Sequence, residues 1–304
     1  MSDTATIAAK RAPERGANAR LRKRLLGNRS VLVGSFIVVA LVLTALLAPW
    51  IAPMDPVAQS IWDKYEPPRG LWVDGSFNTR FVLGADELGR DVLSRIIAGA
   101  RVSLLVGLVA TGLSLLAGLA LGSMAGYVGG WLDTLIMRVM DLLLALPSIL
   151  LALAIIAATG PSIVNAMIAI AIARVPLMAR VIRSEILRLK QEQFVEAAIA
   201  LGSRHARILL LHVLRNAWAP VLVLATLGMG TAIVTEASLS FLGLGTQPPE
   251  ISWGRMLAAG RDAIRNAPHV SLYPGIAITL VVLGFSLLGD GLRDVFDSRL
   301  GDGK

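Results

Sequence analysis

The stretch SVLVGSFIVVALVLTALLAPWIAPM, residues 30–54, contains no charged side chain. A helix needs about 20 consecutive apolar residues to cross the hydrocarbon layer of a bilayer, so this stretch is long enough to span one. It follows a basic run at residues 20–24, but it is too long for the hydrophobic part of a secretory signal peptide. We therefore predict an uncleaved first membrane span.

Five more apolar segments follow along the chain. We expect spans within 102–132, from about 133 to 160, from 161 towards 183, over 216–242, and within 274–289. The third and fourth spans share a charge-free stretch, 142–173, which the turn signal Gly160-Pro161 divides. The sequence thus predicts an all-α, polytopic membrane protein with six transmembrane helices.

The composition supports lipid as the solvent of this fold. Hydrophobic residues make up 55% of the 304 residues and charged residues 16%, against about 25% charged in soluble domains. Aromatic residues are only 5% and glycines number 29, so aliphatic side chains alternate with small ones, as close packing of membrane helices requires. Cysteine is absent, which excludes disulfides and thiolate sites.

The basic residues predict an orientation. With the N-terminus in the cytoplasm, 20 of the 29 Lys and Arg residues fall on the inner side and nine on the outer side, as the positive-inside rule requires. We expect a multi-pass protein of the bacterial inner (plasma) membrane with both termini cytoplasmic. The net charge of +8 then needs no nucleic-acid partner, because a basic patch with interleaved aromatics is missing.

These spans divide the chain into five parts. We expect a disordered, basic cytoplasmic tail at 1–29, the first span at 30–54, an extracytoplasmic loop region at 55–100, a core of five transmembrane helices at 101–290 with a cytoplasmic loop at 184–216, and a cytoplasmic C-terminal tail at 291–304. A second outer segment includes a short interfacial helix, Trp253 to Ile264, with a tryptophan anchor.

Catalytic motifs are missing from the sequence. It contains no HExxH zinc motif and no Gly-Lys-Ser/Thr phosphate loop, and the histidines His205, His212 and His269 have no carboxylates at metal-ligand spacing. We expect no enzyme activity, no metal and no cofactor bound by this chain. An integral-membrane enzyme would need a catalytic pair at one depth, which we do not find.

Two charged positions near the spans carry expectations of their own. Glu236 lies well inside an apolar helix, where a carboxylate is costly. It lines a solute path or makes a structural hydrogen bond, and the sequence leaves both open. Arg138 and Asp141 stand three residues apart on one helix face, so we expect them to pair with each other.

The loop between the fourth and fifth spans reads QEQFVEAAIALGSRHARILLLHVLRN, residues 191–216. Its first half is a short amphipathic helix: Phe194, Ala198 and Leu201 line one stripe, with Val195 and Ile199 beside it. Gly202 supplies a helix stop and Ser203 is expected to cap the next helix. Such a helix docks on a partner or lies on lipid headgroups.

At this loop the sequence resembles the inner-membrane permease subunits of type I ABC importers. Glu196-Ala197-Ala198 followed by Gly202 is similar to the EAA signature of that family. Three further stretches resemble the second permease of the pair in the dipeptide/oligopeptide/nickel branch. They are LGADELGRDVLSR (83–95), EASLSFLGLGTQPPEISW (236–253) and LGDGLRDVFDSRL (288–300).

The resemblance implies a mechanism and a set of partners. The partners are a homologous permease, two ABC ATPase subunits that bind ATP, an extracytoplasmic peptide-binding protein, and membrane lipid. Four residues would couple this chain to an ATPase: Glu196, Ala197, Ala198 and Gly202. Three others would contact the binding protein: Asp86, Arg90 and Asp91. Closure of the ATPases would push the coupling helix and turn the permease pair from inward-open to outward-open.

Some alternatives stay open on the sequence. Dipeptides, oligopeptides and nickel complexes all fit as the solute. A secondary transporter would show discontinuous helices with intramembrane acids or an internal repeat, and the sequence offers neither clearly. One departure from the family pattern is Arg215, which stands where members usually have proline, so the helix is free to continue into the fifth span.

Overall fold

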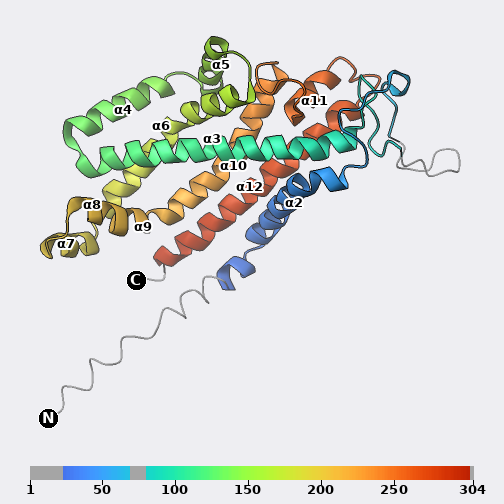
Figure 1. The fold of residues 1–304 in the computed structure, drawn as a ribbon. Coiled ribbons are helices and arrows are strands. Elements are labelled where there is room, and N and C mark those ends of the chain that lie inside the picture. Colours follow the sequence, from blue (N-terminus) through green and yellow to red (C-terminus); the bar gives the residue numbers. More distant parts are fainter. Residues whose placement is uncertain (1–22, 69–79, 302–304) are drawn as a thin grey trace.

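The computed structural model describes residues 23–68 and 80–301, and within these ranges it contains helices and no strand. The elements are α2 (Arg29–Ile51), η2 (Ile61–Asp63), α3 (Val92–Val128), α4 (Gly130–Leu144), α5 (Ser148–Thr159), α6 (Ile163–Leu189), α7 (Gln193–Ala200), α8 (His205–Arg207), η3 (Ile208–Val213), α9 (Leu214–Asn216), α10 (Trp218–Phe241), α11 (Trp253–Gly260) and α12 (His269–Gly301). They form an elongated bundle (Figure 1). The predicted all-α fold is confirmed.

Five described helices are long and apolar enough to cross a membrane: α2, α3, α6, α10 and α12. The pair α4 and α5 passes the same test together but is bent by 87° at its junction. The six predicted spans therefore correspond to five continuous helices and one broken one. The predicted division at Gly160 is present, because Gly160 ends α5 with a φ of 91°.

The bend between α4 and α5 was not among the features predicted from the sequence. Ala145 ends α4 and Pro147 precedes α5. Proline has no N–H to donate and disfavours a helical conformation in the residue before it. Pro147 therefore interrupts a charge-free stretch that composition alone describes as continuous.

The seam between α3 and α6 is the most extensive helix contact of the described bundle. Gly118, Gly122 and Gly126 of α3 follow one another at every fourth position and face α6. A Cβ atom added at Gly122 would lie 2.5 Å from the carbonyl oxygen of Ala179, and one at Gly126 2.9 Å from that of Arg183. Small residues at this spacing let two membrane helices approach with their backbones nearly touching.

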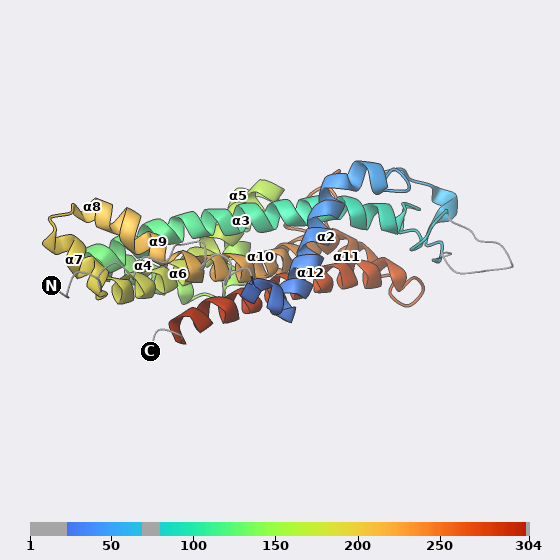
Figure 2. The same cartoon turned by 90° about the horizontal axis from the view of Figure 1, so that it is seen from below.

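The first span packs on the outside of the bundle. Helix α2 contacts α12 and α3 and crosses them at an angle (Figures 1 and 2). Glycines again allow the approach: a Cβ at Gly284 of α12 would lie 2.6 Å from Cγ2 of Ile37. Helix α2 therefore lies at the periphery of the bundle.

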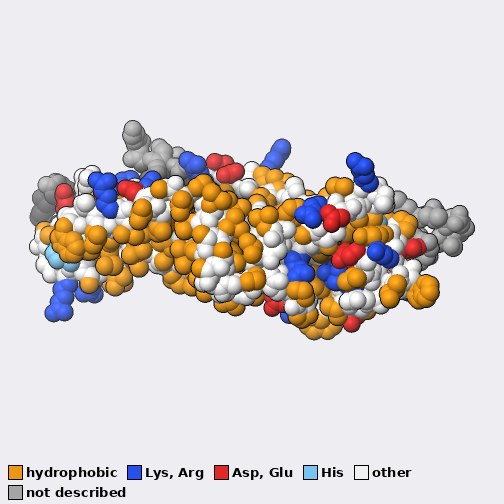
Figure 3. Space-filling model, turned by 90° about the horizontal axis from the view of Figure 1, so that it is seen from above, with side chains coloured by type: hydrophobic (Ala, Val, Ile, Leu, Met, Phe, Trp, Pro, Cys, Tyr) orange, Lys and Arg blue, Asp and Glu red, His pale blue; other side chains and the backbone are white. Residues whose placement is uncertain are grey.

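The two ends of the bundle differ. Helices α7, α8 and α9 lie at one end, here called the α7 end, and α11 lies towards the other, here called the α11 end (Figure 1). Hydrophobic side chains cover much of the face shown in Figure 3, with charged side chains along one edge and toward the ends. Large exposed residues such as Leu108 (62% exposed) and Leu116 (67%) lie in the middle of α3, as lipid contact requires.

The chain ends and loops depart from the sequence expectation in three places. Residues 23–27 are helical, although they belong to the tail predicted as disordered; residues 1–22 of that tail lie outside the described part. The predicted C-terminal tail begins at 291, yet α12 continues as one helix to Gly301. The expected short helix from Trp253 is present as α11 and ends at Gly260. The predicted tryptophan anchor is wrong, because Trp253 is 2% exposed and its indole N–H donates to the carbonyl of Ile96 at 2.9 Å inside the bundle.

Candidate coupling helix and translocation groove

Helix α7 ends in a glycine-based stop. Gly202 has a φ of 75°, in the left-handed region that glycine enters without steric cost. The N–H of Gly202 donates to the carbonyl of Ile199 at 2.9 Å, and the N–H of Ser203 to that of Ala198 at 3.1 Å. This pair of hydrogen bonds is a Schellman motif, which satisfies the last carbonyls of the helix. The predicted stop is confirmed.

The predicted role of Ser203 as a cap is wrong. The residue at the N-cap of α8 is Arg204, and no side chain caps that helix. The backbone N–H of Ser203 is instead used to close the end of α7. The chain then continues through α8, a π-helical turn in η3 and α9 to α10, with Ala217 between the last two. A nearly continuous helical path matches the expectation from Arg215.

The predicted apolar stripe of α7 is divided between two faces. Val195 and Ala198 are buried and pack against Ile186, Leu189, Ile208 and Val213. The exposed side shows Leu201 (85% exposed) and Ile199 (52%). Of the four predicted coupling residues, Glu196, Ala197 and Gly202 are exposed, whereas Ala198 holds the helix to its own chain.

Polar contacts tie α7 to the long helices beside it. Arg188, near the end of α6, pairs with Glu185 at 2.6 Å and with Glu192 at 3.1 Å. On the other side, Lys190 donates to the carbonyl of Tyr127 at 2.9 Å, and the Tyr127 hydroxyl lies 3.1 Å from Nδ1 of His205. These contacts hold the residues on either side of α7 against the ends of α3 and α6.

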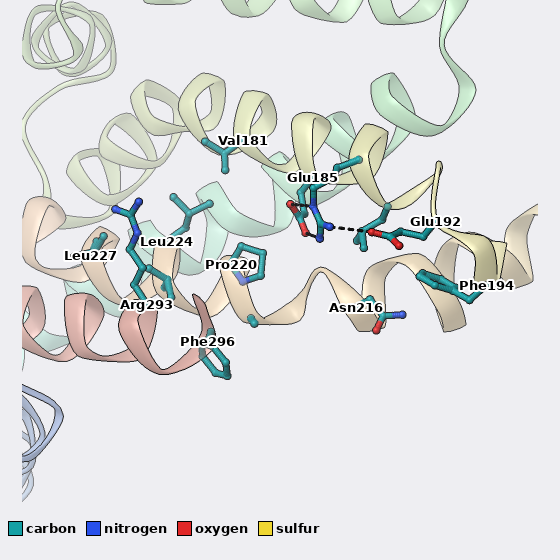
Figure 4. Close-up of a pocket in the computed structure, with 14 residues that line it drawn as sticks. Val181, Glu185, Glu192, Phe194, Asn216, Pro220, Leu224, Leu227, Arg293 and Phe296 are labelled. Atoms are coloured by element: carbon teal, nitrogen blue, oxygen red, sulfur yellow. Dashed lines mark hydrogen bonds and ion pairs between the residues drawn. The ribbon is translucent and has the colours of Figure 1, made fainter. Parts of the chain in front are cut away.

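A cavity of about 680 Å³ opens next to α7 (Figure 4). It is lined by Val181, Glu185, Arg188, Leu189, Glu192, Phe194, Asn216, Ala219, Pro220, Val223, Leu224, Leu227, Arg293 and Phe296. Its walls are α6 on one side and α10 on the other, with α12 contributing at the edge. Its volume lies in the range of pockets that hold small ligands. We call this cavity the α6–α10 groove.

Two ion pairs that were not predicted from the sequence join α4 to α6. Arg183 donates to both carboxylate oxygens of Asp133, at 2.5 and 2.6 Å, and Arg180 donates to Asp141 at 2.6 Å. The expected pairing of Arg138 with Asp141 is therefore wrong: Asp141 pairs across to α6. Local spacing along one helix had favoured Arg138, but helix packing brings Arg180 within reach.

At the α11 end, Asp86 is the hub of a buried network. Its carboxylate accepts from Nε of Arg90 at 2.7 Å and from the backbone N–H groups of Leu88 and Arg90. Arg95 lies 3.4 Å from the same carboxylate. Asp91 is also buried and caps α3 by accepting from the N–H and hydroxyl of Ser94, at 2.7 and 2.6 Å. Both carboxylates therefore fix the loop before α3.

A smaller cavity of about 230 Å³ lies beside this network, and Arg90, Glu87 and Arg255 line it. Burial lowers the pKa of Arg255; the nearby charge of Arg90 lowers it further, and Glu87 opposes the shift. Of the three predicted binding-protein contacts, Arg90 reaches this partly open space (its side chain is 15% exposed), whereas Asp86 and Asp91 are 3% exposed.

Glu236 is fully buried near the α11 end of α10. Its Oε1 accepts from the hydroxyls of Ser240 at 2.6 Å and Thr246 at 3.0 Å. These contacts join α10 to the loop that follows it. Of the two roles that the sequence left open for Glu236, these contacts are the structural hydrogen bond. A place for Glu236 on the solute path stays a prediction.

The described residues contain no group of three or more His, Asp or Glu side chains placed to hold a metal ion. Taken together, the chain is a multi-span membrane protein with a helix presented at one end of the bundle and a groove beside it.

Comparison with known families agrees with this class. The family model for the binding-protein-dependent transport system inner membrane component matches residues 118–302. A second model, the N-terminal TM domain of oligopeptide transport permease C, matches residues 19–68. The chain belongs to the family of binding-protein-dependent transport permeases.

Relatives with curated names cover nearly the whole chain. The dipeptide transport system permease protein DppC of Alkalihalophilus pseudofirmus is 44% identical over 91% of this chain and 88% of its own length. The di/tripeptide transport system permease protein DppC of Pseudomonas aeruginosa is 46% identical over 90% and 89%. The glutathione transport system permease protein GsiD of Escherichia coli is 42% identical over 91% and 89%.

Proposed function

We propose that this chain is the transmembrane permease subunit of an ATP-driven importer for dipeptides or short oligopeptides. One observation carries the proposal: α7 presents exposed apolar and small residues at the end of a membrane bundle and closes on a left-handed glycine. An apolar surface of this kind favours a protein partner. The peptide substrates in the relatives' names support the solute class.

The proposed partner at α7 is an ABC ATPase subunit. ATP binds to two such subunits and not to this chain. A homologous permease completes the path, and an extracytoplasmic binding protein delivers the peptide at the α11 end. There Arg90 is our candidate contact, while Asp86 and Asp91 act by holding the shape of the loop that carries it. Glu196, Ala197 and Gly202 present the coupling surface, and Ala198 anchors it.

The experiment is transport by the reconstituted complex. Proteoliposomes with both permeases, the ATPases and the binding protein should accumulate dipeptides and short oligopeptides only with ATP. Free peptides and nickel complexes are compared at equal concentration. Uptake driven by an ion gradient without ATP would make the chain a secondary transporter, and uptake of nickel complexes alone would overturn the solute class.

Orientation has its own test. We propose that the α7 end is cytoplasmic and that the α11 end faces outward, because most basic residues of the chain then lie inside. The chain has no cysteine, so Arg207→Cys and Arg261→Cys each introduce a unique thiol. A membrane-impermeant reagent added outside intact cells should label the second and not the first. The reverse pattern would invert the proposed topology.

A further inference from the structure

Arg174 lies deep within a membrane span. It is eleven residues after Ile163, the first residue of α6, and so about 16 Å along the helix at 1.5 Å per residue. The hydrocarbon layer is about 30 Å thick, which puts Arg174 near its middle. A guanidinium cannot lose its charge at physiological pH, so this position needs a compensating group or a water-filled space.

The described part of the chain supplies no acidic partner for Arg174. Other arginines of α6 are paired: Arg180 with Asp141, Arg183 with Asp133, and Arg188 with two glutamates. Arg174 instead donates to the hydroxyl of Thr231 on α10. Its Nε is buried and has no hydrogen-bond partner.

The opposite helix leaves room for this guanidinium. A Cβ atom added at Gly228 of α10 would lie 3.0 Å from a terminal nitrogen of Arg174. Beyond it, Thr231 and Thr235 are one turn apart on the same side of α10, and Thr231 and Val234 are exposed. The guanidinium therefore lies against a glycine and a hydroxyl on a side of α10 that is open in this chain.

Arg174 does not line the α6–α10 groove but lies beyond one of its ends. Leu227, which is one turn from Thr231, lines one end of this cavity, as does Val181, two turns from Arg174 (Figure 4). The groove continues from there towards α7. A solute that moves out of the groove past Leu227 would thus next meet the positive charge of Arg174.

We propose that Arg174, with Thr231 beside it, is a binding station for the carboxylate of the transported peptide. This inference rests on the proposed peptide import. A guanidinium binds a carboxylate through two parallel hydrogen bonds, and every peptide with a free C-terminus carries a terminal carboxylate whatever its side chains. When no peptide is present, the guanidinium donates to the Thr231 hydroxyl. The peptide carboxylate would replace this acceptor on binding and give it back on release, so that binding is reversible.

Two other anions could satisfy the same charge: an acidic side chain of the second permease, or a lipid phosphate. The test separates them by using the complete transporter and Leu227→Cys, a unique thiol in this cysteine-free chain. Labelling of this chain by a thiol reagent is followed in the presence of a tripeptide or its C-terminal amide. The binding protein is left out, because its own pocket selects peptides.

The free tripeptide should protect the thiol and the amide should not. Arg174→Gln should raise the half-protecting peptide concentration about tenfold or more, the loss expected when a charge-assisted hydrogen bond is removed. Arg174→Lys should retain part of the protection. Arg180→Gln, on the same helix but paired with Asp141, is the matched control and should leave protection unchanged.

Equal protection by acid and amide, or no protection at all, would overturn the proposal. If Arg174→Gln reduces co-purification of the second permease, the partner of Arg174 is that subunit. If its effect follows the anionic lipid content, the partner is lipid. Peptide uptake by the unmodified complex is measured in parallel: failure there refutes peptide import itself, whereas normal uptake with unchanged protection in Arg174→Gln refutes only the station.

Discussion

The two sides of α6 are built in opposite ways. Towards α3, glycines bring the backbones so close that an added methyl group at Gly122 would meet a carbonyl oxygen at 2.5 Å. Towards α10, the same helix borders a cavity of about 680 Å³. Packed interiors transmit displacement because they have little free volume. Helices α3 and α6 are therefore suited to move together as one body, whereas the groove between α6 and α10 is suited to change its width.

The position of α7 relates this difference to the coupling proposed above. Helix α7 lies in the connection between α6 and α10, and its buried residues Val195 and Ala198 contact both the end of α6 and the turn that leads to α10. A push on α7 thus acts on the two walls of the groove. Under the proposed coupling, a partner that binds at α7 would thereby alter access to the path between α6 and α10.

The largest effect is expected from Gly122→Val, which tests whether close packing of α3 on α6 is needed for the fold. Its branched side chain would enter the α3–α6 seam, where the neighbours are the backbone of Ala179 and the branched Cβ of Ile182, so neither can move aside cheaply. Overpacking of this kind costs about 1 to 3 kcal/mol or more. We expect a lower thermal midpoint and a reduced yield of folded complex.

The matched control is Gly112→Val, on the same helix, where an added Cβ meets nothing within 4 Å. It should leave the yield unchanged. Equal losses from the two variants would show that valine in α3, and not the seam, is responsible.

A smaller effect is expected at the end of α7. In Gly202→Val, a side chain is forced into the left-handed region at a cost of about 1 to 2 kcal/mol, or a factor of roughly 5 to 30 in an equilibrium. Nothing lies within 4 Å of an added Cβ there, so assembly should survive. Peptide uptake and the stimulation of ATP hydrolysis by loaded binding protein should fall together.

Gly202→Asn is the matched variant, because asparagine tolerates the left-handed conformation. It should keep most of the uptake. Normal uptake by the valine variant would mean that the helix stop is not needed for coupling, and loss of the complex would move its role to assembly.

The groove itself is tested by Leu224→Trp, which fills space between α6 and α10. We expect uptake to fall roughly fivefold, equivalent to about 1 kcal/mol in the rate-limiting barrier. The thermal midpoint should stay within error. Leu108→Trp, at a position that is 62% exposed on α3, is the control. If both tryptophans reduce uptake alike, the groove is not on the path.

The sequence predicted the spans because their composition is dictated by lipid, and it predicted the stop at Gly202 because only backbone geometry decides that position. It did not predict which helices meet. Asp141 has Arg138 three residues away, yet it pairs with Arg180, 39 residues on. The hydroxyl of Thr246 reaches Glu236 only because the intervening loop folds back. One signal was available: glycines at 118, 122 and 126 have the spacing of a close helix contact.

The smallest effect is expected at the contact between α4 and α6, which tests whether α4 moves together with α3 and α6. The side chains of Asp133 and Arg183 are mostly buried (18% and 30% exposed) and share two hydrogen bonds. The side chains of Asp141 and Arg180 are about half exposed (52% and 51%). An exposed pair contributes about 0 to 1 kcal/mol, while hydrogen bonds to charged groups contribute about 1.5 to 3 kcal/mol.

Asp141→Asn should therefore hardly change the thermal midpoint, and its small effect should vanish at high salt because exposed charges are screened. Asp133→Asn should lower the midpoint measurably at any salt concentration. If the two variants have the same effect on the thermal midpoint, Asp133 does not hold α4 to α6. Only α3 and α6 would then move as one body.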